Sequence, residues 1–177
     1  DINVDTGAIN ASGYLAAFGV HADASGTGAV TVDTHGDLTA DAYYGNAAGI
    51  YAYAAGGAVG AYATGNIVAT SVYGNADGID AQAYGNATVT SAGDVTATST
   101  FGAAYALHAV SNAGDASVDA GAGVIYANSS YGNAAGILVF ADGNADVTAN
   151  GAIAAYSQGG LGAGIAAFAN TGNAVVQ

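Results

Sequence analysis

The chain has 177 residues with no Lys, Arg, Cys, Met, Trp or Pro, and its 13 Asp residues give a formal net charge of −13 at pH 7. Nucleic acids and anionic membranes are disfavoured as partners, because binding to phosphate groups depends on Lys and Arg. The lack of Cys excludes disulfides and thiolate metal sites. No apolar run is long enough for a membrane span and no signal peptide is recognisable, so we expect no membrane insertion by this segment, which we interpret as part of a longer precursor.

A repeat of about 29 residues runs six times along residues 1–177, and a period of this length is typical of a solenoid rather than a globule. We therefore expect a single repeat domain. Each repeat begins near a glycine, namely Gly7, Gly36, Gly65, Gly93, Gly121 and Gly151.

Each repeat contains three short segments in which branched apolar residues and Ala alternate with outward polar or aromatic residues, and this period of two predicts strands. The first column of inward residues consists of Ile9, Leu38, Ile67, Val95, Ile125 and Ile153. The second column consists of Val20, Ile50, Ile79, Leu107, Ile137 and Ile165. The third contains Val30, Val89, Val118 and Val147, with Val59 or Ala61 in the second repeat and Val175 or Val176 at the end.

Short Gly-Asn segments separate the strands, and we expect corners there because Gly and Asn tolerate left-handed backbone conformations. Stacked repeats place equivalent corner residues above one another. An aromatic ladder is predicted at Tyr44, Tyr73, Phe101 and Tyr131. Beside it, an amide ladder is predicted at Asn46, Asn75 and Asn133, with an interruption at Ala103.

These patterns predict an all-β fold, a right-handed parallel β-helix (β-solenoid) of about six triangular coils with three short strands per coil. Each strand pairs in parallel with its equivalent in the next coil at a spacing of ~4.8 Å, so six coils would form a rod roughly 29 Å long.

The candidate chemistry is limited to His and Asp. His21 and His108 fall in the same outward column three coils apart, which is too far to share a metal, and His35 lies at a corner. Asp pairs stand at 77/80, 37/41, 115/119 and 142/146, a spacing that in principle suits the acid and base of a glycosidase. We favour a solubilising role for these Asp residues. We thus predict no catalytic, cofactor-binding or metal-binding residue, with calcium left open because Asp, Asn and corner carbonyls supply oxygen ligands.

The stretch Tyr-Gly-Asn-Ala-(Ala/Asp)-Gly-Ile at 44–50, 73–79 and 131–137, together with Gly-Asp-Val-Thr-Ala at 93–97, resembles the repetitive passenger regions of bacterial autotransporters and haemagglutinin-like adhesins. The resemblance implies a β-helical segment carried to the surface of a Gram-negative bacterium, as a stalk, an adhesin or a matrix fibre.

The expected function is that of a non-enzymatic, extracellular structural segment. Its expected partners are flanking coils of a longer parent chain, other copies of itself stacked end to end, or a host or matrix surface. Two alternatives remain open. One is a self-assembling extracellular filament subunit, since open solenoid ends expose unpaired backbone. The other is a β-helix protein that binds or cleaves a polysaccharide.

Overall fold

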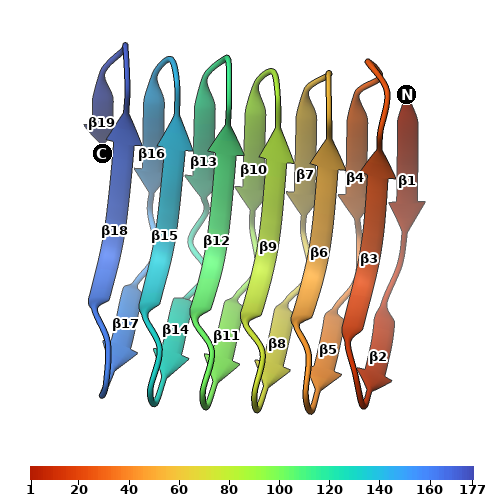
Figure 1. Cartoon of the computed structure of the whole chain (residues 1–177), viewed down its shortest axis with the longest axis vertical. Helices are drawn as coiled ribbons and strands as arrows, with labels where there is room; N and C mark the ends of the chain where they lie inside the picture. The colour runs from red at the N-terminus through yellow and green to blue at the C-terminus, as the bar shows by residue number, and fades with distance from the viewer.

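The computed structural model describes residues 1–177 and contains 19 β-strands, no helix and no cis peptide bond. The strands form three parallel sheets, one of seven strands and two of six (Figure 1). Equivalent residues of neighbouring coils are 28 to 30 positions apart in the sequence. The predicted β-solenoid of about six coils with three strands per coil is confirmed.

Sheet A contains β1 (Ile2–Thr6), β4 (Val30–Thr34), β7 (Val59–Ala63), β10 (Ala87–Ser91), β13 (Ala116–Ala120), β16 (Ala145–Ala149) and β19 (Ala174–Val176). Sheet B contains β2 (Ile9–Gly13), β5 (Leu38–Ala42), β8 (Ile67–Ser71), β11 (Val95–Ser99), β14 (Ile125–Ser129) and β17 (Ile153–Ser157). Sheet C contains β3 (Ala17–Ala24), β6 (Ala47–Ala54), β9 (Ala76–Ala83), β12 (Ala104–Ser111), β15 (Ala134–Ala141) and β18 (Gly162–Ala169).

The coils are flattened, with the long strands of sheet C on one side and the shorter strands of sheets A and B on the other (Figure 1). The chain rises along sheet C, crosses behind it, descends through sheets A and B and advances by one coil, which makes the solenoid right-handed as predicted. The longest axis runs along the strands and the shortest crosses between the two sides. Six coils therefore form a slab that is wider along its strands than along its stack, not the rod that we predicted.

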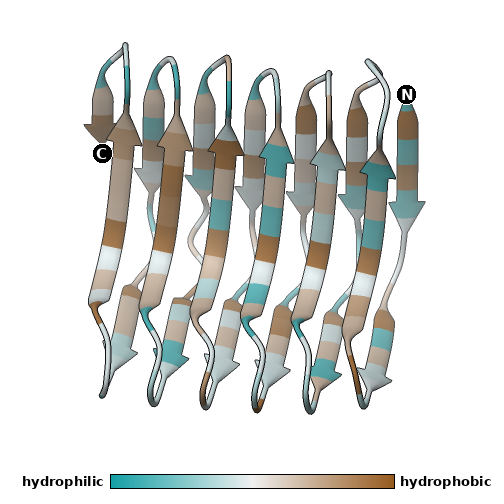
Figure 2. Ribbon diagram, viewed as in Figure 1, coloured by the Kyte–Doolittle hydropathy of each residue, from teal (hydrophilic) through white to brown (hydrophobic).

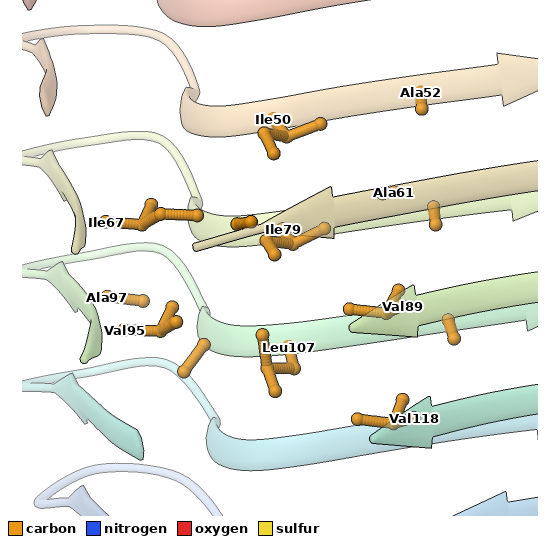
Figure 3. Close-up of a cluster of buried hydrophobic side chains, with 14 of the residues drawn as sticks. Ile50, Ala52, Ala61, Ile67, Ile79, Val89, Val95, Ala97, Leu107 and Val118 are labelled. Atoms are coloured by element: carbon orange, nitrogen blue, oxygen red, sulfur yellow. The ribbon is translucent and has the colours of Figure 1, made fainter. Parts of the chain in front are cut away.

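The core is a set of in-register columns of small and branched side chains. The first two predicted columns pair as expected, for example Val95 with Ile125 in sheet B and Leu107 with Ile137 in sheet C. In the inner coils these side chains are fully buried, and they interleave between the two sides of the slab (Figure 3). Alanine fills most of the remaining inward positions, so the side chains of the core are small and closely packed.

The third predicted column is wrong at Val30. Val30 pairs with Val59, whereas Val32 pairs with Ala61, which in turn pairs with Val89. The column of Val89, Val118 and Val147 thus passes through Ala61 to Val32 and ends at Val176. Strand β4 carries two inward valines two residues apart, and a period of two does not tell which of them aligns with the next coil.

Glycine has a different role from the one we predicted, because no residue of the chain has a positive φ. At the corners, an added Cβ on Gly74, Gly102 or Gly132 would collide with the backbone of the glycine one coil earlier. Across sheet C, an added Cβ on Gly78 would collide with the side chain of Val95 and the carbonyl oxygen of Ala106. Five of the six strands of sheet C have glycine at this position, and Figure 2 shows a pale band beside the apolar column in these strands. Glycine is needed for close approach of backbones rather than for left-handed turns.

Candidate functional site

The aromatic ladder is confirmed. Rings stack from Tyr44 to Tyr73, Phe101 and Tyr131 with centroids 5.0, 4.9 and 5.1 Å apart and interplanar angles of 13°, 6° and 7°. Tyr14 meets Tyr44 edge-on at 5.0 Å and so extends the cluster toward the first coil. Since the rings cover one another's faces, this ladder stabilises the corner and leaves mainly ring edges to solvent.

The predicted amide ladder has a different bonding pattern. Asn46 Oδ1 accepts a hydrogen bond from the backbone N–H of Asn75, and Asn75 Oδ1 accepts one from Ala103. Each side chain thus bonds the backbone of the next coil rather than the next side chain, so Ala103 ends the chain of acceptors without losing its own bond. Asn133 does the same with the N–H of Leu161.

At the other two corners, Asn and Asp side chains also accept a hydrogen bond from the backbone of the next coil, which we did not predict. Between sheets A and B, the acceptors are Asp37, Asn66 and Asp94. Between sheets C and A, they are Asp1, Asn86, Asp115 and Asn144. Several Asp residues that we assigned to solubility therefore also join neighbouring coils.

A buried serine ladder was missed as well. The hydroxyl of Ser99 donates to Gly74 O in the preceding coil at 2.8 Å and accepts from Gly102 N in its own coil at 2.9 Å. Ser71, Ser129 and Ser157 repeat this arrangement, and they pair with one another in register. The signal was present in the sequence, because each of these serines follows the first-column residue by four positions.

None of these ladders brings acidic side chains together, but the outer face of sheet C does. Of the four Asp pairs, only Asp77 and Asp80 are buried, with 8% and 6% of their surface exposed. Both belong to β9, whose outward side chains face a neighbour on each side in the sheet. Asp77 lies between Ala48 and Tyr105, and Asp80 lies between Tyr51 and His108. For this pair the predicted solubilising role is wrong, because the neighbouring rings cover the two carboxylates.

His108 and Asp80 form the closest ionic contact of the chain, with Nδ1 3.0 Å from Asp80 Oδ1. The contact lacks the alignment of a hydrogen bond, and Asp80 Oδ1 is the one buried side-chain oxygen or nitrogen without a hydrogen-bond partner. Asp80 Oδ2 accepts a hydrogen bond of 2.8 Å from Gln82 Nε2. Asp80 and His108 each directly follow a second-column residue, so their meeting in neighbouring coils could have been predicted from the sequence, but we did not pair them.

The cluster has strongly perturbed acidity. Burial, and then the charge of Asp80, raise the pKa of Asp77 to about 7, against a smaller opposing effect of His108. Burial acts to lower the pKa of His108, but polar contact with Asp80 and the negative charges of Asp80 and Asp77 outweigh it and the pKa is raised. Burial and the negative charges of Asp80 and Asp23 also raise the pKa of Tyr51. A carboxyl group with a pKa near neutrality can act as a proton donor or bind a positive charge.

A cleft of about 350 Å³ opens beside the two carboxylates on the side of the earlier coils. Its floor is Ala48, whose small side chain leaves space between Phe18 in β3 and Asp77 in β9. The other residues that line it are His21, Asp23, Asn46, Tyr51 and Asp80.

The remaining histidines lie apart. His21 is in the outward column of His108, separated from it by Tyr51 and Asp80, as the three-coil spacing predicted. His35 Nε2 lies 3.4 Å from Asp5 Oδ1 in an exposed pair at a corner. No three His or Asp side chains converge as a set of metal ligands.

The chain contains no helix that is long and apolar enough to cross a membrane. No protein-family model matches it, and neither a curated protein nor a solved structure is significantly similar to it. The functional assignment therefore depends on the geometry of the stacked coils and of the cleft.

Proposed function

We propose that the chain is a structural, non-enzymatic β-solenoid segment of a bacterial surface protein, displayed outside the cell as part of a stalk or adhesin. The observation that supports this most directly is that the repeated residues contact neighbouring coils. The apolar columns, the serine ladder, the aromatic ladder and the Asn/Asp acceptors all contact the coil before or after their own. Such residues make a solenoid that is continuous and stiff along its axis.

The two end coils support axial continuation. Ile2 and Ile9 in the first coil, and Ile153 and Ile165 in the last, are only partly buried although they belong to core columns. The end strands also present one unpaired backbone edge each, which in parallel sheets pairs readily with another strand. Flanking coils of a longer parent chain would cover both surfaces with the same register, and a host or matrix surface is the proposed target of the assembled stalk.

Assembly of separate copies into a filament is the alternative within the same class. The half-buried residues at the ends of the core columns favour such assembly, but the unequal numbers of strands in the three sheets oppose it. Sheet A has seven strands and sheets B and C have six. A second copy that pairs its β2 with β17 and its β3 with β18 would need to place β1 where β19 already lies. Stacking of copies through all three sheets thus requires β1 or β19 to give way.

Location outside the cell is tested by immunogold labelling with an antibody raised against the folded solenoid. We expect label on the surface of intact cells, along fibrous or stalk-like material. Label that is seen only after cells are permeabilised would contradict the proposed location.

A polysaccharide-binding or polysaccharide-cleaving protein is the alternative of another class. The feature that favours it is the pair Asp77 and Asp80, since glycosidases use one carboxyl with a raised pKa and a second that is ionised. Incubation with candidate polysaccharides, followed by an assay for new reducing ends, tests it. On our proposal no reducing ends appear; release that is lost in Asp77→Asn would establish the enzyme instead.

A further inference from the structure

The cleft on sheet C is lined by two buried carboxylates and by aromatic side chains. Asp77 and Asp80 are more than nine-tenths buried, and Asp80 already contacts the later coil through Oδ1, which lies 3.0 Å from His108 Nδ1, while its Oδ2 accepts a hydrogen bond from Gln82. Asp77, which lines the cleft, differs: no hydrogen bond to its carboxyl compensates for its burial, so its ionised form carries a negative charge that the protein balances only in part. The basic side chain closest to the two carboxylates is His108, which lies on the side of Asp80 away from Tyr51.

Aromatic side chains of the two preceding coils also line the cleft. Phe18, His21 and Tyr51 form a cluster, with ring centroids 4.9 Å apart for Phe18 and His21 and for His21 and Tyr51, and 6.0 Å apart for Phe18 and Tyr51. Ring faces attract cations, and carboxylates beside such rings add a direct charge interaction. Asp23 contributes a further carboxylate at the rim.

We propose that this cleft binds an organic cation, an alkylammonium or guanidinium group, which the carboxylates of Asp77 and Asp80 and the rings of Phe18 and Tyr51 hold. None of the 177 residues is Lys or Arg, so no side-chain ammonium or guanidinium group of these coils can occupy the site. The group comes either from a free small amine or from a basic side chain of a partner protein, and the chemistry of recognition is the same for both.

A bare metal ion fits the cleft less well. The volume of about 350 Å³ is that of a small organic group rather than of a single ion. Metal sites for Ca²⁺ need six or more oxygen ligands around the ion, and no set of three acidic or histidine side chains converges here. Aromatic walls favour organic cations over strongly hydrated metal ions.

Binding to this site depends on pH in a defined direction. A cation stabilises the ionised form of Asp77, whose pKa is about 7, so below neutrality the apparent affinity falls about tenfold for each pH unit. The other titratable groups that face Asp77 are Asp80 on the same strand, Tyr105 and His108 on β12, Tyr51 on β6, and His21 and Asp23 on β3. Protonated His108 repels the cation, and this repulsion is lost as the pH rises through the raised pKa of His108. Both effects therefore strengthen binding at higher pH.

The test is calorimetric titration of the whole 177-residue chain with methylguanidinium and with tetramethylammonium, in about 0.15 M NaCl to screen non-specific attraction to the acidic surface. The variants are Asp77→Asn and Asp80→Asn. Asp146→Asn is the matched control, because Asp146 is an exposed outward residue of sheet A. Thermal unfolding of each variant checks that it is folded.

We expect saturable binding of one cation per chain, at least tenfold weaker in both cleft variants and unchanged in Asp146→Asn, with affinity that rises from about pH 5.5 to about pH 7.5. A short peptide with a single central Arg distinguishes the two sources: tighter binding than methylguanidinium indicates a protein partner, and equal binding indicates a free amine. Absence of saturable binding would overturn the proposal. So would equal binding to Asp77→Asn, or displacement of methylguanidinium by stoichiometric Ca²⁺, which would make the cleft a metal site.

Discussion

The carboxyl of Asp77 lies among Ala48, Tyr105 and Asp80, where its ionised form loses hydration and faces a second negative charge. Its pKa in the folded protein, about 7, is well above the ordinary value of 3.8. The folded state thus holds this proton more tightly than the unfolded state. The stability that the protonated form provides is complete below about pH 4 and is lost as the pH rises to 7, by an amount on the order of a few kcal/mol.

The raised pKa of His108 acts in the same direction, because its charged contact with Asp80 is lost as the pH rises through the folded-state value. We therefore predict that the free energy of unfolding in denaturant falls between about pH 4 and pH 8. Asp77→Asn should be more stable than the natural chain at pH 7 and should show a weaker pH dependence. Asp119→Asn, at an exposed outward position, serves as control. A parallel pH profile for Asp77→Asn and the natural chain would contradict this account.

The hydroxyl of Ser99 predicts a second effect at the residue scale. Ser99→Ala removes the donor to Gly74 O and the acceptor for Gly102 N at a site that is 1% exposed, and it leaves both backbone groups unsatisfied. We expect a loss of about 1–3 kcal/mol in the free energy of unfolding, measured by denaturant titration. Ser130→Ala, half-buried and without a side-chain hydrogen bond, should change stability by less than about 0.5 kcal/mol. Equal losses in the two variants would show that the ladder is not stabilising.

At this scale the sequence supports some inferences and not others. Tyr44, Tyr73 and Phe101 could be placed in one stack, because equal spacing in a solenoid means direct contact. The bond from Asn46 to the backbone of the next coil depends on the rotamer and the corner geometry, which spacing does not contain. The burial of Asp77 depends on the residues that flank it in the coils before and after its own. A single repeat does not contain this information.

Strands behave as in-register units, and neighbouring positions of one strand should therefore respond in opposite ways to the same substitution. Ile137 in β15 is fully buried, whereas Leu138 beside it faces outward and is partly exposed. Ile137→Asp should abolish cooperative folding of the adjoining coils, since it buries a carboxylate with no partner. Leu138→Asp should cost about 1 kcal/mol or less. Circular dichroism during thermal unfolding measures both, and a stable Ile137→Asp protein would contradict the assigned inward face.

At the element scale, the sequence predicted strand identity and the register of sheets B and C. In those sheets every inward branched residue of the two columns is followed two positions later by Ala, except Ile137, which is followed by Val139, and this pattern leaves a single alignment. Sheet A was ambiguous because Val30 and Val32 in β4, and Val59 and Ala61 in β7, offer two inward residues of similar size. The role of glycine could not be predicted from the sequence either, because the close approach of backbones is visible only when the coils are stacked.

The shape of the whole molecule follows from coil number. Because the slab is widest along its strands, only additional coils would produce a structure that is longest along the stack. The period alone predicts the stacking direction, but it does not predict the flattening, which results from the long strands of sheet C facing the shorter strands of sheets A and B.

The seven-to-six strand count predicts how copies associate. Removal of residues 172–177, which contain β19, leaves six strands in every sheet and clears the position for β1 of a second copy. We expect this truncated chain to form longer stacks than the full chain in sedimentation velocity and negative-stain microscopy. Adding Ile2→Asp to the truncated chain should abolish the stacks, because it puts a carboxylate into the joined core. Identical behaviour of truncated and full chains would contradict the competition between β1 and β19.

The most direct test of the structural role is cryo-electron microscopy of the native material on or shed from the cell surface. On this account, coils with the strand repeat of ~4.8 Å continue along one axis well beyond the six of this chain. Separate six-coil particles, without coils of a parent chain or other copies at either end, would contradict a stalk or fibre. The cleft on sheet C would then be the better candidate for the functional site.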